Sequence, residues 1–254
     1  MAAALAQPRQ ISLLGKARAL IRLTCMVMLL LACIPLHYVC HILRLPNPWP
    51  RVFLGGVAWL AGVELSYRGQ RARGGVFLIS NHVSWIDVPA LAAANGSAFV
   101  GHDGLAAMPL IKWLCRMNRT VFIARHDRTS VALQVEAVRA ALNDSGALTI
   151  FPEGTTSDGT GLLPFKSSLL SAFEPLPAGI AVQPVLLDYG PEAAGIAWVG
   201  EEHGLDNFLR ILARSKPVRL TVHFLPPLTG AALENRKTIA AAARSAMLQE
   251  LLKP

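Results

Sequence analysis

The first 63 residues of the chain contain no aspartate or glutamate, although they contain six lysine and arginine residues. Across all 254 residues only 16% are charged, whereas 53% are hydrophobic, and the net charge is +8. A basic chain is expected to bind anionic partners. The sequence has no zinc-finger spacing, aromatic RNP motif or basic helix, so we expect no nucleic-acid partner. An anionic membrane accounts for the basic charge and the apolar composition together.

Other motifs are also missing. The chain has only four cysteines and no C-x-x-C pair, which argues against a disulfide framework and fits a reducing compartment. No H-E-x-x-H motif occurs, and no third ligand lies at helical spacing, so we expect no metal. A G-x-S-x-G motif is absent as well, which argues against a serine hydrolase.

Charge is missing from residues 23–43, an apolar run that would be ~32 Å long as a helix, about the thickness of a bilayer core. Two arrangements are open for this segment. The run could span the membrane as a helix kinked at Pro35. It could also form a hairpin in one leaflet, with a second apolar helix over 52–65 after the proline-rich turn at 45–50. A cleaved signal peptide is less favoured, because no clear small-x-small site follows the run.

The basic residues between Arg9 and Arg22 favour the cytoplasmic side in both arrangements. We therefore predict that residues 1–66 form a membrane-associating helical segment on the cytoplasmic face of the inner (cell) membrane.

Residues 67–254 have the pattern of one α/β domain, because short apolar runs alternate with helix-like stretches. We predict a mixed central sheet flanked by helices. The predicted strands are 76–79, 120–124, 147–151, 182–187, 196–199 and 218–224, and the predicted helices are 129–142, 205–212 and 231–252.

A histidine and an aspartate lie five positions apart in the segment NHVSWID. Histidine is well suited to take a proton near neutral pH, and a carboxylate can fix its tautomer. Positions five apart diverge on one helix, so His82 and Asp87 can meet only if His82 lies in a loop and Asp87 in the first helical turn. Ser84 would then be the N-cap. The alternative is that Asp87 only caps a helix and His82 is a turn residue.

A second segment, FPEGTT, follows the apolar run 147–150. Gly154 permits a tight turn, and Thr155 and Thr156 offer hydroxyl and N–H donors that could face an anion. Glu153 is expected to organise this loop or a neighbouring cation.

Two basic residues are further candidates for the same site. Arg125 follows a predicted strand and offers a planar fork for phosphate oxygens, and Lys166 adds positive charge nearby in sequence. For each of these residues, the alternative is a solvated basic face.

The two motifs resemble those of the glycerolipid acyltransferase family, whose signature is Asn-His, four residues and Asp, followed by Phe-Pro-Glu-Gly-Thr. His82 and Asp87 match the first motif, Arg125 matches an intermediate arginine block, and the segment QPV at 183–185 is similar to the last block. The resemblance covers roughly residues 65–190. It implies an N-terminal pair of membrane-docking helices, which favours the hairpin.

The resemblance also implies a reaction. His82 would activate the hydroxyl of a lysolipid for attack on an acyl thioester of coenzyme A or acyl carrier protein, with Asp87 orienting the imidazole and no resident cofactor. The usual acceptor would be 1-acyl-sn-glycerol 3-phosphate, giving phosphatidic acid. The commonest family form has arginine where this chain has Thr156, and this variant resembles acyltransferases of lyso-ornithine lipids. A membrane lipid hydrolase and a non-catalytic lipid-binding protein are the alternatives from other classes.

Overall fold

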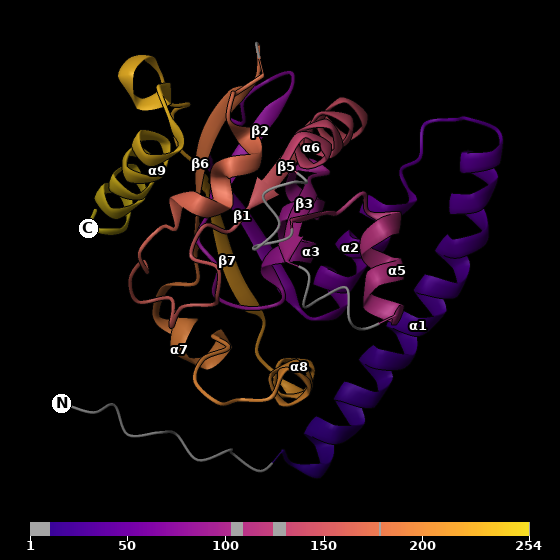
Figure 1. Cartoon of the computed structure of the whole chain (residues 1–254). Coiled ribbons are helices and arrows are strands. Elements are labelled where there is room, and N and C mark those ends of the chain that lie inside the picture. Colours follow the sequence, from indigo (N-terminus) through magenta and orange to yellow (C-terminus); the bar gives the residue numbers. More distant parts are fainter. Residues whose placement is uncertain (1–10, 103–108, 124–130, 178, 254) are drawn as a thin grey trace.

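The computed structural model describes residues 11–102, 109–123, 131–177 and 179–253 (Figure 1). Its strands are β1 (Val63–Gly69), β2 (Val76–Ser80), β3 (Ala98–His102), β4 (Val121–Ile123), β5 (Ala147–Ile150), β6 (Ala181–Asp188) and β7 (Val218–Phe224). They form one sheet in the order β1-β7-β6-β2-β5-β3-β4. The strands from β6 to β4 run parallel to one another, whereas β7 is antiparallel to β6 and parallel to β1. The predicted mixed sheet is therefore confirmed.

Helices cover both faces of the sheet. They are α1 (Leu13–Ile42), α2 (Trp49–Leu60), α3 (Asp87–Asn95), α5 (Pro109–Met117), α6 (Val131–Ser145), α7 (Ala193–Ile196), α8 (Gly204–Ala213) and α9 (Arg236–Leu251). Short 3₁₀ helices occur at Ser167–Phe173, Gly190–Glu192 and Gly230–Leu233.

Strand β2 shows how the core is divided, because its five residues are all buried. Val76 and Leu78 face a core formed with α1, α2, α3 and α8, while Phe77 and Ile79 face a second core formed with α6 and α9. This alternation follows from the period of two in a strand. In Figure 1, α9 and α1 accordingly lie on opposite sides of the sheet.

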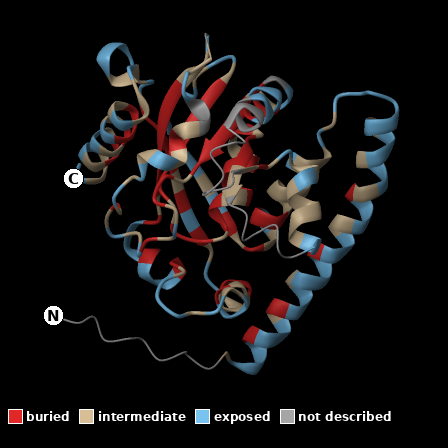
Figure 2. Ribbon diagram, in the orientation of Figure 1, coloured by how far each residue is buried: buried red, intermediate tan, exposed pale blue. Residues whose placement is uncertain are grey.

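The N-terminal element consists of α1 and α2, joined by the turn at 43–48. Helix α1 begins at Leu13, earlier than the predicted start at residue 23, and continues through Pro35. It is long and apolar enough to cross a membrane. Most of this helix is coloured as exposed in Figure 2. Its exposed residues include the large apolar Met28 and Leu31. Such an exposed apolar surface is unusual for a protein in water.

The second predicted helix, 52–65, is wrong at its carboxyl end. Helix α2 ends at Leu60, Gly62 takes the left-handed conformation with φ +84°, and Val63 begins β1. The apolar residues 63 and 65 continue the hydrophobic pattern of α2, but they belong to an edge strand that pairs with β7. Strand β1 therefore includes the predicted boundary between the helical segment and the α/β domain at residue 66. The division of the chain into these two parts at that residue stays a prediction.

The strand predicted at 196–199 is also wrong. Ile196 ends the short helix α7, and residues 197–199 have an irregular backbone. Ile196 and Ala197 are buried under α8, which explains their apolar character without a strand. Strands β1 and β3 and helix α5 were not predicted from the sequence.

Candidate active site

Three neighbouring strands, β6, β2 and β5, end at the same edge of the sheet. Ligand sites in open parallel sheets lie beyond the carboxyl ends of the strands. His82 follows β2, the FPEGTT loop follows β5, and Tyr189 directly follows β6. The topology therefore brings the two sequence motifs together at one edge.

The predicted pair of His82 and Asp87 is in contact. His82 Nδ1 lies 2.7 Å from Asp87 Oδ2, with His82 in the loop after β2 and Asp87 as the first residue of α3. The same carboxylate oxygen accepts hydrogen bonds from the backbone N–H of Val83 at 2.6 Å and of Ser84 at 2.9 Å. Asp87 is fully buried, and its charge lies at the N-terminus of α3, where the helix dipole favours an anion. The Asp87 carboxylate is thus held in place by backbone contacts in addition to its contact with the imidazole.

The expected N-cap at Ser84 is wrong. The cap position is Ile86, which makes no side-chain cap hydrogen bond, and the Ser84 hydroxyl donates instead to Asn207 Oδ1 at 3.3 Å. The backbone N–H of Ser84 is bonded to Asp87, so the carboxylate three residues ahead organises the turn that the serine was expected to organise.

Tyr189 is a site residue that the sequence did not reveal. Its hydroxyl donates to Asp87 Oδ1, the carboxylate oxygen that does not contact His82. Burial, together with the negative charge of Asp87, raises the pKa of Tyr189 well above its ordinary value, so the hydroxyl keeps its proton and stays a donor. The available signal was its position just after the predicted strand 182–187, but an aromatic residue there is as readily part of the core.

The second ring nitrogen of His82 is available for chemistry. Its Nδ1 faces Asp87, and Nε2 has no hydrogen-bond partner among the described residues. The ring stacks on Phe151 with centroids 4.2 Å apart and planes 18° apart, and 20% of the side chain is exposed. A general base must be oriented by a neighbouring group and accessible to the substrate, and the imidazole of His82 meets both conditions.

The FPEGTT loop packs directly against the His82 loop. The backbone N–H of Ser157 donates to the His82 carbonyl oxygen at 2.7 Å, and the Ser157 hydroxyl donates to the same oxygen at 3.1 Å. Gly154 has φ +70°, so the tight turn expected there is present. A Cβ at Gly154 would lie 3.3 Å from Lys166 Nζ, which means that the lysine side chain folds over the turn. The loop therefore combines a glycine turn with a lysine cation close to that turn.

The two threonines of this loop differ. Thr155 is exposed, whereas the Thr156 hydroxyl donates its hydrogen to the Trp198 carbonyl oxygen. A hydroxyl has one hydrogen to donate, so that of Thr156 is engaged within the protein. Both roles as substrate ligands stay predictions, as does that of Lys166, which is exposed. Arg125 lies outside the described residues, and its predicted role as a head-group ligand is unchanged.

Glu153 is almost completely buried, at 1% exposure. Neither carboxyl oxygen makes a hydrogen bond of normal geometry with a described residue. Burial raises its pKa to about 8, and the negative charge of Asp87 adds to the effect, while the backbone of His82 and Leu163 and the Arg244 guanidinium offset part of it. At neutral pH Glu153 is therefore mostly an uncharged acid behind the histidine. It is too buried to touch a substrate in this structure.

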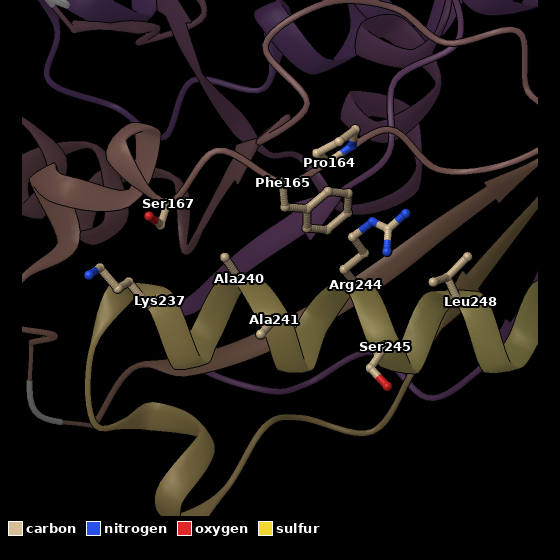
Figure 3. Close-up of a pocket in the computed structure, with 9 residues that line it drawn as sticks. All are labelled: Pro164, Phe165, Ser167, Lys237, Ala240, Ala241, Arg244, Ser245 and Leu248. Carbon is tan, nitrogen blue, oxygen red and sulfur yellow. The ribbon is translucent and has the colours of Figure 1, made fainter.

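Arg244 also lines an open groove of about 610 Å³ between α9 and residues 164–167 (Figure 3). Its guanidinium donates to the carbonyl oxygens of Leu162 and Leu163. Neither His82 nor Asp87 lines this groove, so it is not where the pair could act. Among the described residues, no group of three or more histidine, cysteine, aspartate or glutamate side chains could hold a metal ion.

Comparisons with known proteins agree with this arrangement. The acyltransferase family matches residues 63–188, the region that contains both motifs. The lyso-ornithine lipid O-acyltransferase of Rhodobacter capsulatus is 30% identical over 251 residues, which cover 93% of this chain and 91% of that protein. The enzyme of the same name from Brucella abortus is 31% identical, covering 90% and 91%.

Two further proteins carry a different acceptor in their names. The 1-acyl-sn-glycerol-3-phosphate acyltransferase of Neisseria meningitidis is 34% identical over 131 residues, which cover 52% of this chain and 51% of that protein. The crystal structure of the 1-acyl-sn-glycerophosphate acyltransferase PlsC from Thermotoga maritima superimposes with a TM-score of 0.65 over 96% of each chain, at 16% identity, and so shares the fold. With near full-length relatives at 30% identity and the matching family region around His82 and Asp87, the chain belongs to the glycerolipid acyltransferase family.

Proposed function

We propose that this protein is a membrane-bound O-acyltransferase that moves a fatty acyl group from a thioester to the hydroxyl of a lysolipid. The observation that carries the proposal is the His82–Asp87 contact of 2.7 Å, with no described residue bonded to the opposite ring nitrogen of His82 and the side chain partly open to solvent. This geometry suits a general base for a hydroxyl nucleophile.

In the proposed mechanism, His82 Nε2 takes the proton of the acceptor hydroxyl as its oxygen attacks the thioester carbonyl. Asp87 holds the proton on Nδ1 and stabilises the imidazolium that forms, and Tyr189 with two backbone N–H groups keeps Asp87 in place. The thiol leaves as the tetrahedral intermediate collapses, and the proton on Nε2 passes to the sulfur. The acyl group thus moves in one exchange of a C–S bond for a C–O bond.

Direct transfer is favoured over an acyl-enzyme. The hydroxyl of Ser84 donates to Asn207, and that of Ser157 donates to the His82 carbonyl oxygen. Neither is bonded to the imidazole, as an activated serine would be. The donor is a thioester of coenzyme A or acyl carrier protein, and no resident cofactor takes part in the proposed reaction.

For the acceptor, lyso-ornithine lipid has the stronger support. The relatives that this chain matches over nearly their whole length carry that name, and Thr156 is turned to Trp198 instead of offering the positive charge that arginine brings to the common family form. The second candidate, 1-acyl-sn-glycerol 3-phosphate, is favoured by Lys166 over the Gly154 turn and by the predicted role of Arg125. A phosphate needs such cations.

The membrane element is proposed to lie in one leaflet. Arg18 and Arg22 of α1 donate to carbonyl oxygens at the end of α8, and Tyr38 of α1 accepts from Trp113 of α5. The ~30 Å of helix between these points is about one bilayer core. If α1 spanned the membrane, charged residues on α8 and α5 such as Arg210 and Lys112 would enter the hydrocarbon. We place α1 and α2 on the cytoplasmic face of the inner membrane.

The test is a panel of lysolipids offered to the purified enzyme in detergent with an acyl thioester, with thiol release and product mass both measured. The proposal expects thiol release that depends on a lysolipid and a product heavier by one acyl group. Thiol release without any acceptor would identify a hydrolase. Unaltered lipid binding with no turnover would identify a binding protein. The head group that gives the highest kcat/KM decides between the two acceptors.

A further inference from the structure

Residues 196–210 lie beyond the region that the acyltransferase family matches, yet they contact both catalytic motifs. Trp198 makes these contacts with its backbone. Its N–H donates to the Val83 carbonyl oxygen at 2.9 Å, and its own carbonyl oxygen accepts the hydrogen of the Thr156 hydroxyl. The backbone of Trp198, which lies shortly after α7, is thus bonded to the His82 loop through its N–H and to the FPEGTT loop through its carbonyl oxygen.

The same segment reaches the His82 loop a second time through Asn207, which is fully buried on α8. Asn207 Oδ1 accepts from the Ser84 hydroxyl at 3.3 Å, and its amide donates to the Ala197 carbonyl oxygen at 3.1 Å and to Glu202 at 2.8 Å. Arg210 holds Glu202 with two further bonds of 2.8 and 2.9 Å. Charge-assisted bonds of this kind are the stronger ones, and a fully bonded buried network is rigid.

Val83 and Ser84 are also the two residues whose backbone N–H groups hold Asp87. Other polar groups of the same two residues are bonded to the segment after α7: the Val83 carbonyl oxygen accepts from the Trp198 N–H, and the Ser84 hydroxyl donates to Asn207 Oδ1. The Val83–Ser84 segment, which bonds to the Asp87 carboxylate, is therefore itself held in place by Trp198 and Asn207.

We propose that residues 196–210 form a clasp that positions His82 and Asp87 for catalysis. The positioning residues are Asn207, within the clasp, and Thr156, in the FPEGTT loop that the clasp contacts. Neither residue touches the imidazole in this arrangement. They act through the backbone of Trp198, Val83 and Ser84. The catalytic part of this inference rests on the proposed acyl transfer.

The chain offers a matched set of variants for Thr156. Thr156→Val removes the hydroxyl and keeps the shape, whereas Thr156→Ser keeps the donor. Thr160→Val is the control, since Thr160 lies in the same loop but its hydroxyl bonds only to Asp158 among the described residues. Ser84→Ala removes the hydroxyl that donates to Asn207 and so tests that contact.

Two experiments are made on each variant. Steady-state kinetics gives kcat and KM for a lysolipid, and hydrogen exchange is followed for the peptide covering residues 80–88. For Thr156→Val the clasp predicts a kcat about 10-fold to 100-fold lower, because a small displacement of reacting groups is costly, with KM within about twofold. Exchange of residues 80–88 should become faster. Thr156→Ser should restore kcat and the exchange rate, and Thr160→Val should match the wild type.

The clasp is overturned if Thr156→Val keeps the exchange rate and kcat of Thr160→Val, or if KM rises while kcat holds, since that split would make Thr156 a substrate ligand. Unchanged kcat and exchange in Ser84→Ala would remove Asn207 from the proposal. If no variant, nor the wild type, transfers acyl groups to any lysolipid, the proposed function fails, and the exchange measurement alone still decides whether the clasp holds the His82 loop.

Discussion

The edge of the sheet around His82 and the helix pair α1–α2 are built in opposite ways. At the edge, the buried carboxylate of Asp87 is held by hydrogen bonds from four described donors. In α1, large apolar side chains are exposed, and contacts to the rest of the protein include two arginines on the end of α8. A network of hydrogen bonds fixes geometry, whereas an exposed apolar surface fixes only the environment in which the molecule is stable.

This contrast suggests a division of labour. If the proposed function holds, the edge of the sheet sets the rate of the chemical step, and the helix pair sets how strongly the protein binds a lipid surface. Changes in one region should therefore leave the property of the other region unaltered.

The largest effect is expected for Asp87→Asn. An amide can no longer hold the proton on His82 Nδ1 as a carboxylate does, so kcat should fall by about 10³-fold or more while binding to vesicles stays as in the wild type. Steady-state kinetics and vesicle co-sedimentation measure the two properties. Asp158→Asn, an exposed change in the neighbouring loop, is the control. A fall of less than about tenfold in Asp87→Asn would argue against the pair.

The converse change is the double variant Met28→Asp and Leu31→Asp, at positions 62% and 58% exposed on α1. A carboxylate in the membrane core costs on the order of 3 kcal/mol, so the two aspartates together should weaken vesicle binding by more than about 100-fold. Turnover of a short-chain lysolipid that is soluble without a membrane should not change. Met28→Ala with Leu31→Ala serves as the control. Vesicle binding equal to the wild type would exclude α1 as the docking surface.

Tyr189→Phe should have a smaller effect at the edge of the sheet. It removes one of the four donors to Asp87, a hydrogen bond to a charge worth about 1.5–3 kcal/mol. We expect a kcat about tenfold lower at an unchanged KM. Tyr67→Phe, at an exposed position on β1, is the comparison variant. Equal kcat in both variants would show that the remaining three contacts suffice.

The last prediction concerns stability instead of turnover, and it involves Glu153. Its pKa in the folded protein is about 8, above the usual value for glutamate, so the folded state keeps a proton that the unfolded chain has lost. Stability from this group is complete at pH below about 4.5 and is lost as the pH rises to about 8. The Tm of Glu153→Gln should therefore fall less than that of the wild type between pH 5 and pH 8. Parallel Tm curves for the two proteins would show that Glu153 is ionised when buried.

The two motifs could be read from the sequence because each is local. The loop at His82 and the turn at Gly154 are set by residues within a few positions, and a strand before each motif is recognisable by its apolar run. The contacts that support the two motifs could not be predicted from the sequence. Tyr189 reaches Asp87 across 102 positions, and Thr156 reaches Trp198 across 42, so only the fold brings them together.

The errors have a similar origin. The buried residues 196–197 look like part of a strand because a short apolar run is ambiguous between strand and helix. The predicted helix 52–65 includes the first three residues of β1, because the apolar pattern of α2 continues without a charge until Glu64. In both places tertiary contacts, with α8 and with β7, decide the local structure.

The most direct test of the central claim compares His82→Ala with the wild type in one assay that contains an acyl thioester, with and without lyso-ornithine lipid. We expect lipid-dependent thiol release and the acylated product both to disappear in His82→Ala, while lysolipid binding and the Tm remain. Turnover in His82→Ala within a few-fold of the wild type would contradict this expectation.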